Sequence, residues 1–197
     1  MKYTNLVEIF SLLKVIMSNF IKIGSNTLFN GKKNLVASKD SKIIIGKYCA
    51  IANGINIITL NHDYNFPAIQ GTLYKKKFNN SHPGCITEPP NKERTKGDVI
   101  IGNDVWIGED VFIGSGVKIG DGCCIGAKSV VTRDLPAYTI CVGSPCKDIK
   151  KRYSQEIIDF LLTIKWWDWN DPKIKRNKEF FYTNLNNIND VSEIIIQ

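Results

Sequence analysis

An aliphatic residue recurs at every sixth position along residues 101–136, which divide without remainder into IGNDVW, IGEDVF, IGSGVK, IGDGCC, IGAKSV and VTRDLP. Glycine follows it in five of these six repeats, and the fifth position is small or β-branched in the first five. Residues 45–57 carry the same frame. A helix needs a period near 3.6 and a flat strand a period of 2, so a period of six indicates neither.

A six-residue period predicts one short strand and one corner per repeat, with three repeats forming one triangular coil of a parallel β-helix. We expect the aliphatic residue to point inward and to stack on its counterpart in the next coil. The glycine is expected at the corner, where the backbone needs a positive φ or a close approach. The fold is therefore predicted to be dominated by β-structure, and most repeat residues to be scaffold.

Residues 60–97 interrupt the repeat and are rich in Pro, Gly, Asn and Lys. Long insertions in compact domains are usually functional or disordered. Order in its first half is indicated by four aromatic residues, Tyr64, Phe66, Tyr74 and Phe78. His62 lies where the chain leaves the coils, and the other histidine, His82, is expected to be a surface loop residue. A secondary role in acceptor binding is the alternative for His82.

His62 is well placed to act as a base. Histidine has an ordinary pKa of about 6.5, so its neutral form predominates at pH 7 and accepts a proton from a hydroxyl or an amine. The alternative is a histidine packed at the base of a loop.

The two ends of the chain predict helices. Apolar residues at helical spacing between Leu6 and Phe20 predict a short amphipathic helix packed on the body, with a membrane-surface helix as the alternative. Glu8 and Lys14 interrupt this stretch and no cleavage site follows, so neither a signal peptide nor a membrane span is expected. We predict an N-terminal helix over 1–22, a β-helix over 23–150 with an insertion at 60–97, and a helical segment over 151–197.

The amino-acid composition limits the classes of binding partner and the cellular compartment that we expect for the protein. The net charge of +7 is compatible with nucleic acid, an anionic surface or a phosphorylated ligand. Aromatic residues do not interleave with basic ones, and no helix-turn-helix or finger spacing occurs, so no nucleic acid partner is expected. The six cysteines form no CxxC pair and are expected to be free thiols in a reducing compartment, most of them packed as small apolar side chains. A cytoplasmic protein without membrane contact is predicted.

Three motifs carry a resemblance to a known family. Residues 102–152, the Asn-His pair at 61–62 and the VGSPCK segment at 142–147 resemble the hexapeptide-repeat acetyltransferases. The W-W-x-W motif at 166–169, which follows a predicted helix, is similar to the xenobiotic subgroup. That subgroup includes the type B chloramphenicol and streptogramin acetyltransferases and related sugar O-acetyltransferases. The resemblance covers about residues 43–180.

The resemblance implies a left-handed parallel β-helix with a long inserted loop and C-terminal helices, assembled as a homotrimer with active sites between neighbouring subunits. It implies acetyl-CoA as co-substrate, no metal, and His62 as general base. At the thioester end of acetyl-CoA it places Trp106, Gly108 and Glu109, where a backbone N–H would stabilise an oxyanion. Along the pantetheine and phosphate path it places Ala127, Thr132 and Arg133, and near the nucleotide phosphates Lys147 and Lys150.

Charge and aromatic content bear on the same carboxyl-terminal region. Basic residues concentrate at one end of the solenoid and fit the phosphates of CoA, namely Arg133, Lys147, Lys150, Lys151 and Arg152. For Lys151 and Arg152 a solvated helix face is the favoured interpretation. Trp166, Trp167 and Trp169 are expected to pack in a core rather than to bind the acceptor.

The sequence therefore predicts direct acetyl transfer to an acceptor hydroxyl. A hydroxyl of a sugar or surface polysaccharide is the first choice, because residues 63–96 depart most from the antibiotic-modifying enzymes. An antibiotic hydroxyl is the second choice and the amine of a nucleotide-linked amino sugar the third. Two alternatives lie in other classes. A zinc carbonic anhydrase needs three histidines per metal, which two histidines 20 residues apart do not readily supply; a non-catalytic scaffold is the other.

Overall fold

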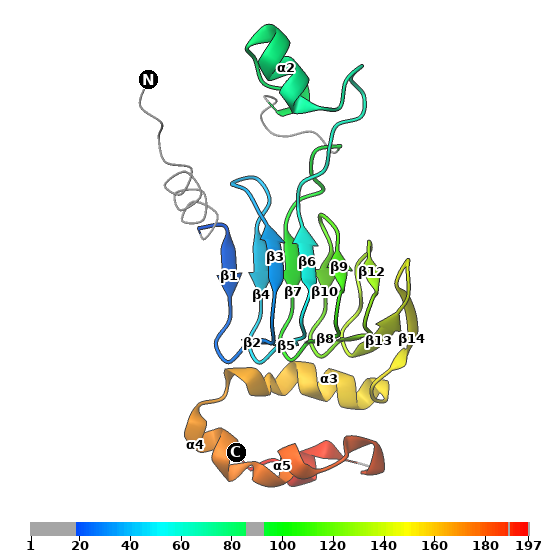
Figure 1. The fold of residues 1–197 in the computed structure, drawn as a ribbon. Coiled ribbons are helices and arrows are strands. Elements are labelled where there is room, and N and C mark those ends of the chain that lie inside the picture. The colour runs from blue at the N-terminus through cyan, green and yellow to red at the C-terminus, as the bar shows by residue number, and fades with distance from the viewer. Residues whose placement is uncertain (1–18, 86–92, 189, 197) are drawn as a thin grey trace.

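The computed structural model describes residues 19–85, 93–188 and 190–196. Residues 19–151 wind into a β-helix whose coils have three faces, called here sheets A, B and C (Figure 1). Sheet A consists, in spatial order, of β1 (Ile21–Ile23), β4 (Ile43–Ile45), β7 (Val99–Ile101) and β10 (Lys118–Ile119). Sheet C consists of β3 (Lys33–Val36), β6 (Ile55–Ile58), β9 (Phe112–Ile113) and β12 (Val130–Val131).

Sheet B is the longest of the three. It consists of β2 (Leu28–Phe29), β5 (Ala50–Ile51), β8 (Trp106–Ile107), β11 (Cys124–Ile125), β13 (Thr139–Val142) and β14 (Lys147–Lys151). All strand pairs of the coils are parallel, and only β14 runs antiparallel to its neighbour β13. The predicted strand-rich fold with parallel sheets is confirmed.

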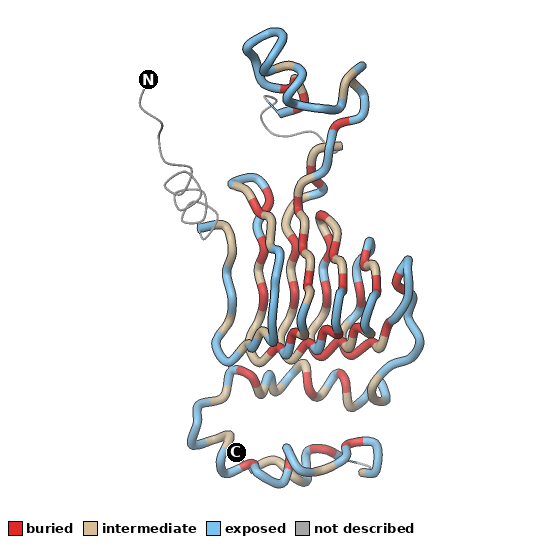
Figure 2. The backbone as a smooth tube through the Cα atoms, in the orientation of Figure 1, coloured by how far each residue is buried: buried red, intermediate tan, exposed pale blue. Residues whose placement is uncertain are grey.

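The repeated aliphatic positions form the core. The side chains of Ile101, Ile107, Ile113, Ile119, Ile125 and Val131 are at most 2% exposed. Each stacks in register on a residue of the next coil, as Ile101 does on Ile45 and on Ile119. Burying one such side chain contributes about 1.5–3 kcal/mol, and the ladder continues through all coils, as the red interior of Figure 2 shows.

At each corner the backbone needs one residue with a positive φ and one residue that allows two coils to approach closely. Two different positions of the repeat meet these two requirements. A positive φ falls on the fourth residue, as at Asp104 (54°), Asp110 (53°) and Gly116 (76°). The glycine in the second position is needed for close approach instead, because a Cβ on Gly108 would lie 2.6 Å from the backbone nitrogen of Ala127. The repeat glycine thus lets successive coils touch, and another residue makes the turn.

The insertion leaves the coils after β6 and returns before β7, in agreement with the predicted interruption at 60–97. It contains the helix α2 (Gly71–Phe78) and the 3₁₀ turn η1 (Pro83–Cys85). Figure 1 shows α2 standing clear of the coils, on the side away from sheet B. The insertion therefore projects from the corner between sheets C and A.

The ends of the chain differ in part from expectation. Residues 1–18, and with them most of the predicted helix over 1–22, lie outside the described residues, and β1 begins at Ile21, inside that predicted helix. At the other end, the predicted helical segment from 151 begins later, because Lys151 still belongs to β14. The C-terminal elements are α3 (Gln155–Ile164), η2 (Trp166–Asp168), α4 (Asp171–Arg176), α5 (Lys178–Tyr182), η3 (Leu185–Asn187) and η4 (Val191–Ile194).

The C-terminal elements have a core of their own, which packs on the corner between sheets A and B. Tyr138 of the last coil belongs to this second cluster, and the ring of Trp166 lies 5.0 Å from that of Tyr48. Trp167 is 4% exposed, and Trp169 packs against the same cluster, so the prediction that the tryptophans form a core is confirmed. None of the described helices has the length and apolar character of a bilayer-spanning segment.

The six cysteines are free thiols. Four of them are buried among apolar side chains, as predicted: Cys49, Cys123, Cys141 and Cys146. Burial raises the pKa of the Cys123 thiol to about 11, against an ordinary value of 9.0. These thiols therefore serve the coils as small apolar residues.

Candidate active site

A buried network of hydroxyl groups holds the base of the insertion. The hydroxyl of Thr95 donates to the backbone carbonyl of Thr59 (2.8 Å) and lies 3.1 Å from the Ser115 hydroxyl. Ser115 also accepts from the backbone N–H of Lys96 (2.7 Å), and Thr59 contacts the Ser41 hydroxyl (2.8 Å). Because these hydroxyls are at most 8% exposed, no water competes for them, and they tie together the two ends of the insertion.

Beyond this network the outgoing and returning segments pair once more. The backbone N–H of Asn61 donates to the carbonyl of Arg94 (2.8 Å). In the opposite direction, the Arg94 guanidinium donates through Nη1 to the Asn61 carbonyl (2.6 Å). Asn61 is thus held on both of its backbone polar groups, one residue before His62.

His62 is exposed at the rim of a cavity of about 230 Å³. The cavity is lined by His62, Asp63, Ile69, Gly71, His82, Gly84, Cys85 and Arg94. Within the described part of the chain, no hydrogen bond or ion pair engages the His62 ring. An imidazole placed in this way is accessible to an incoming hydroxyl, as a general base must be.

His82 is not the surface residue that the sequence predicts, because its side chain is only 5% exposed. Its Nδ1 accepts from the Gly84 N–H (3.0 Å), so the other ring nitrogen, 3.0 Å from the Ala68 carbonyl, carries the proton and donates. The rings of Phe66 and Tyr74 pack edge-on against it. His82 is the centre of a small core inside the insertion, built by the aromatic residues that had indicated order there.

Asp63 stabilises the same fold of the insertion. Its carboxylate is 3% exposed and accepts from the Asn65 N–H (2.9 Å). Gly84 packs directly on it, because a Cβ at that position would lie 2.7 Å from the Asp63 Cβ. Asp63 therefore closes the wall of the cavity beside His62.

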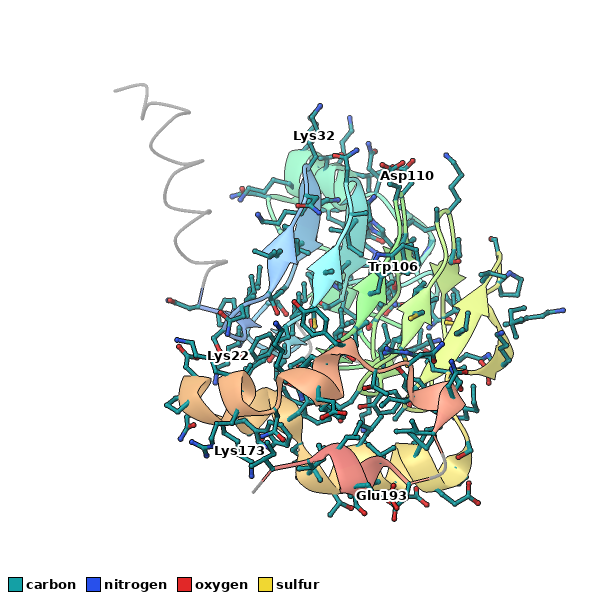
Figure 3. All side chains as sticks on the ribbon, turned by 90° about the horizontal axis from the view of Figure 1, so that it is seen from below. Lys22, Lys32, Trp106, Asp110, Lys173 and Glu193 are labelled. Carbon is teal, nitrogen blue, oxygen red and sulfur yellow. The ribbon has the colours of Figure 1, made fainter. Side chains whose placement is uncertain are left out.

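Three of the residues expected to bind acetyl-CoA, Trp106, Lys147 and Lys150, belong to strands of sheet B. Trp106 is 49% exposed, and Figure 3 shows it on the outer face of this sheet, away from the C-terminal helices. It is in register with Cys124, which is in register with Ile140, and Ile140 is paired with Lys150. Trp106 and Lys150 thus belong to one row of outward side chains.

The corner after β8 carries two of the predicted residues, Gly108 and Glu109. The Gly108 N–H donates to the Ile125 carbonyl (2.8 Å), so this amide is already used in the stacking of coils. Glu109 accepts through its carbonyl from the Lys128 N–H (2.7 Å), while its own N–H has no acceptor among the described residues. Ala127 is exposed in the next coil directly above. Glu109 is therefore the remaining amide donor of this corner.

The predicted phosphate-side residues divide between two places. Lys147 and Lys150 are exposed on β14, at the end of sheet B. Thr132 and Arg133 follow β12, at the corner between sheets C and A, and the Arg133 guanidinium pairs with the Asp148 carboxylate (3.2 Å). This ion pair links that corner to the strand that carries the lysines.

The solvated helix face expected for Lys151 and Arg152 is wrong for both. Lys151 ends β14, and its ammonium donates to Ala137 and Thr139. Arg152 forms a partly buried ion pair with Asp104 (3.2 Å). Burial raises the pKa of the Asp104 carboxyl, and the neighbouring guanidinium acts against that rise.

The base and the predicted thioester residues lie on opposite sides of one chain. His62 follows β6 at the corner between sheets C and A, whereas Trp106 faces outward from sheet B, which is the side opposite that corner (Figures 1 and 3). The structure brings Trp106, Glu109, Ala127 and the two lysines to one side and leaves His62 on the other.

Sequence reasoning missed four residues of the acceptor side: Thr59, Asp63, Arg94 and Thr95. The two threonines could have been found from the sequence, because each lies close to one end of the segment that interrupts the repeat. Asp63 and Arg94 had none, because pairing across an insertion does not follow a period. Among the described residues, no group of three or more His, Cys, Asp or Glu side chains is arranged to hold a metal ion.

Comparison with known proteins places the chain. Residues 98–133 match the family model of the bacterial transferase hexapeptide (six repeats). The chain is 45% identical over 140 residues to a probable macrolide acetyltransferase of Lysinibacillus sphaericus, covering 70% of this chain and 76% of that protein. It is 36% identical over 137 residues to a chloramphenicol acetyltransferase of Klebsiella aerogenes, covering 68% of this chain and 63% of that protein. A solved hexapeptide-repeat acetyltransferase of Vibrio cholerae is 26% identical, with a TM-score of 0.49, covering 67% of this chain and 62% of that one.

The six-residue repeat, the insertion that carries His62 and the named relatives all indicate the same family. The chain belongs to the hexapeptide-repeat acetyltransferases, in the xenobiotic subgroup, and is an acetyl-CoA-dependent acyltransferase.

Proposed function

We propose that this enzyme transfers the acetyl group of acetyl-CoA directly to a hydroxyl group, with His62 as the general base. The observation that carries the proposal is the exposed imidazole at the rim of the cavity, which no described residue engages in a hydrogen bond or ion pair. An acid–base residue must reach its proton within hydrogen-bond distance, and an exposed ring without a competing partner meets that requirement.

The outer face of sheet B fits the donor substrate. Acetyl-CoA supplies the acetyl thioester, an apolar pantetheine arm and a phosphorylated nucleotide. Trp106 offers an exposed aromatic surface at one end of the row, and Lys147 and Lys150 offer exposed cations at the other. Ala127 lies between them. Thr132 and Arg133 lie at the corner between sheets C and A, and Arg133 reaches β14 through its ion pair with Asp148. The Glu109 N–H is the donor proposed for the oxyanion.

The proposed step needs neither a metal nor an acyl-enzyme. His62 takes the proton of the acceptor hydroxyl while the oxygen forms a bond to the acetyl carbon. The carbon–sulfur bond then breaks, and the proton held by His62 passes to the departing thiolate. All atoms balance between acetyl-CoA plus alcohol and CoA plus acetyl ester.

The opposite positions of His62 and Trp106 support assembly. One chain cannot place its own base beside its own thioester residues, because the β-helix stands between them. We therefore propose a homotrimer of left-handed β-helices, formed by residues 23–150, in which His62 of one chain faces the sheet B side of its neighbour. The C-terminal helices leave Trp106 uncovered and so leave that face available.

For the acceptor we propose a sugar or polysaccharide hydroxyl. Three polar or charged side chains, Asp63, His82 and Arg94, line the cavity beside His62 together with one large aliphatic side chain, Ile69. Polar groups in a binding site orient a ligand through hydrogen bonds, and a molecule with many hydroxyl groups offers the most partners for them.

A hydroxyl-bearing antibiotic is the second candidate acceptor. It is favoured by a specific observation, the identity of 45% to a protein described as a probable macrolide acetyltransferase. The exposed rings of Tyr64 (70%) and Phe78 (66%) on the insertion are apolar surface that such a molecule would contact.

The test is thiol release from acetyl-CoA with a panel of sugars, polysaccharides and hydroxyl-bearing antibiotics. We expect acceptor-dependent release that falls by about 10²–10⁴-fold in His62→Ala, the usual contribution of a general base. Imidazole added to His62→Ala is expected to restore part of the rate. Turnover of the variant at the wild-type rate, with assembly intact, would exclude His62 as the base.

A further inference from the structure

One side chain connects the buried base of the insertion to the histidine. The Asn61 carbonyl that accepts from Arg94 Nη1 (2.6 Å) belongs to the peptide bond between Asn61 and His62. The orientation of this peptide group fixes where the next Cα, and with it the imidazole, points. Arg94 therefore contacts the backbone unit that directs His62.

The buried hydroxyl network that holds the base of the insertion does not extend to His62. The hydroxyl network ends with the Thr95 hydroxyl on the Thr59 carbonyl (2.8 Å). Among the described residues, Arg94 makes the hydrogen bonds that join residues 60–62 to the returning segment: its carbonyl accepts from the Asn61 N–H (2.8 Å), and its guanidinium donates to the Asn61 carbonyl. His62 itself is exposed, so no packing of its ring substitutes for this hold.

The chemistry of arginine suits the task. A guanidinium is planar and permanently charged, and its hydrogen bonds to a carbonyl are charge-assisted and stronger than neutral ones. Arg94 belongs to a turn of the returning segment and lines the same cavity as His62. The contact thus crosses from the returning segment to the outgoing one at the level of the imidazole.

We propose that Arg94 is a positioning residue, which aims the His62 imidazole at the acceptor hydroxyl by fixing the Asn61–His62 peptide. This inference rests on the proposed function for its kinetic consequence, but not for its structural one. Arg94 has no catalytic role in it, and the acceptor is unchanged.

Kinetics gives the first test. Misplacement of a catalytic group by about 1 Å costs up to roughly 10²-fold, so we expect Arg94→Ala to lower kcat by about ten- to hundred-fold. The KM for acetyl-CoA is expected to stay constant, because Arg94 is not one of the residues proposed to bind the donor. Arg94→Lys keeps the charge but loses the fork and is expected to recover only a small part of the rate. Millimolar guanidinium added to Arg94→Ala is expected to restore several-fold of it.

The matched control is Arg176→Ala, an exposed arginine at the end of α4. It removes the same charge far from the insertion, so neither kcat nor the response to guanidinium should change. A rate for Arg94→Ala within twofold of wild type would overturn the proposal, as would equal loss in the control.

A second readout does not depend on activity. The chain has two histidines, so a carbon–proton spectrum contains two Cε1–H signals, one from each imidazole, and His62→Ala identifies which belongs to His62. We expect Arg94→Ala to move and broaden the His62 signal while leaving the signal of buried His82 in place. An unmoved His62 signal contradicts the proposal; movement of both signals reports general unfolding of the insertion and contradicts it too.

The two readouts separate this inference from the proposed function. If wild-type enzyme releases no thiol with any acceptor, the proposed function fails, and the spectrum alone decides whether Arg94 orders His62. If His62→Ala abolishes turnover and Arg94→Ala leaves it unchanged, His62 is supported as the general base and the positioning role of Arg94 is excluded.

Discussion

The chain crosses from sheet C to sheet A at corners that differ greatly in length. In one coil the crossing takes residues 114–117, between β9 and β10. In the coil before, the crossing takes residues 59–98, between β6 and β7. The strands on either side of the two corners nevertheless stack in register, as Ile57 does on Ile113 and Ile101 on Ile119. The core thus depends on the strands and is indifferent to corner length.

The short corner also anchors the long one. Ser115, in the middle of the short corner, contacts the Thr95 hydroxyl and accepts from the Lys96 N–H. A regular repeat therefore supplies the attachment point for the irregular segment that carries His62. Long insertions cost little extra free energy in loop closure, so such an anchor is enough to hold one.

The largest effect is expected when the two corners are made alike. Replacing residues 59–98 with the sequence GSGV of the short corner removes His62 and its cavity. We expect acetyl transfer to fall by at least about 10²-fold, while the variant still unfolds in one cooperative transition with a β-type circular dichroism spectrum. Thiol release and thermal melting measure the two outcomes. A variant that fails to fold would show that the insertion is part of the scaffold.

The coils themselves are expected to be sensitive to alkali. The Cys123 thiol has a pKa raised by burial to about 11, against 9.0 ordinarily. The unfolded chain therefore releases this proton at lower pH than the folded one. Stability is complete below pH 9 and falls as pH rises toward 11, by about 2–3 kcal/mol for this residue.

Cys123→Val tests this prediction, because valine occupies the same repeat position at 105, 111 and 117. Urea unfolding at pH 8 and at pH 10.5 gives the loss of stability for each protein. The variant should lose less than the wild type over that range. Equal losses would show that other groups dominate, with Cys49 and Cys141, whose pKa values burial also raises, as the next to replace.

A smaller effect is expected at the anchor between the corners. Thr95→Val keeps the shape of the side chain but leaves the Thr59 carbonyl and the Gly97 N–H without their partner. Buried groups left in this way cost about 1–3 kcal/mol. Urea unfolding should show the loss, and thiol release should fall several-fold as the insertion loosens. Thr132→Val, at the exposed corner above, is the matched control for stability.

The smallest effect is expected from an ion pair between neighbouring corners on the other side. Lys128 and Asp110 approach to 3.3 Å, with side chains 79% and 54% exposed. Solvent screens such pairs, so Lys128→Ala should change stability by less than about 0.5 kcal/mol. A larger loss would mean that surface charge contributes to corner stacking more than the coil core suggests.

The fold was predictable because its core is periodic. Each inward position from Ile101 to Val131 repeats in the sequence, and each is buried. The reversal of β14 was not predictable, because the segment between β13 and β14 carries no six-residue repeat. The six-residue period is also the same on all three faces, so it does not say that His62 and Trp106 lie on opposite sides.

A residue of the candidate site was predictable from the sequence only where a side chain suited to catalysis stands at an interruption of the six-residue repeat. His62 stood at such a break, and the structure leaves it exposed. The prediction that His82 lies at the surface was wrong, because its burial depends on Phe66 and Tyr74, which contact it only after the insertion folds. Arg94 had no signal, because its partner is a backbone carbonyl, and backbone groups are the same at every residue.

The reversed strand β14 has a consequence for how the molecule behaves at high concentration. A parallel stack ends in a row of unpaired backbone groups, which is a template for another chain. Here β14 turns back and covers the edge of β13 in sheet B, and it carries two exposed lysines, Lys147 and Lys150. Charged side chains on an edge strand disfavour pairing with a second molecule, so stacking of solenoids end to end is opposed where the longest sheet stops.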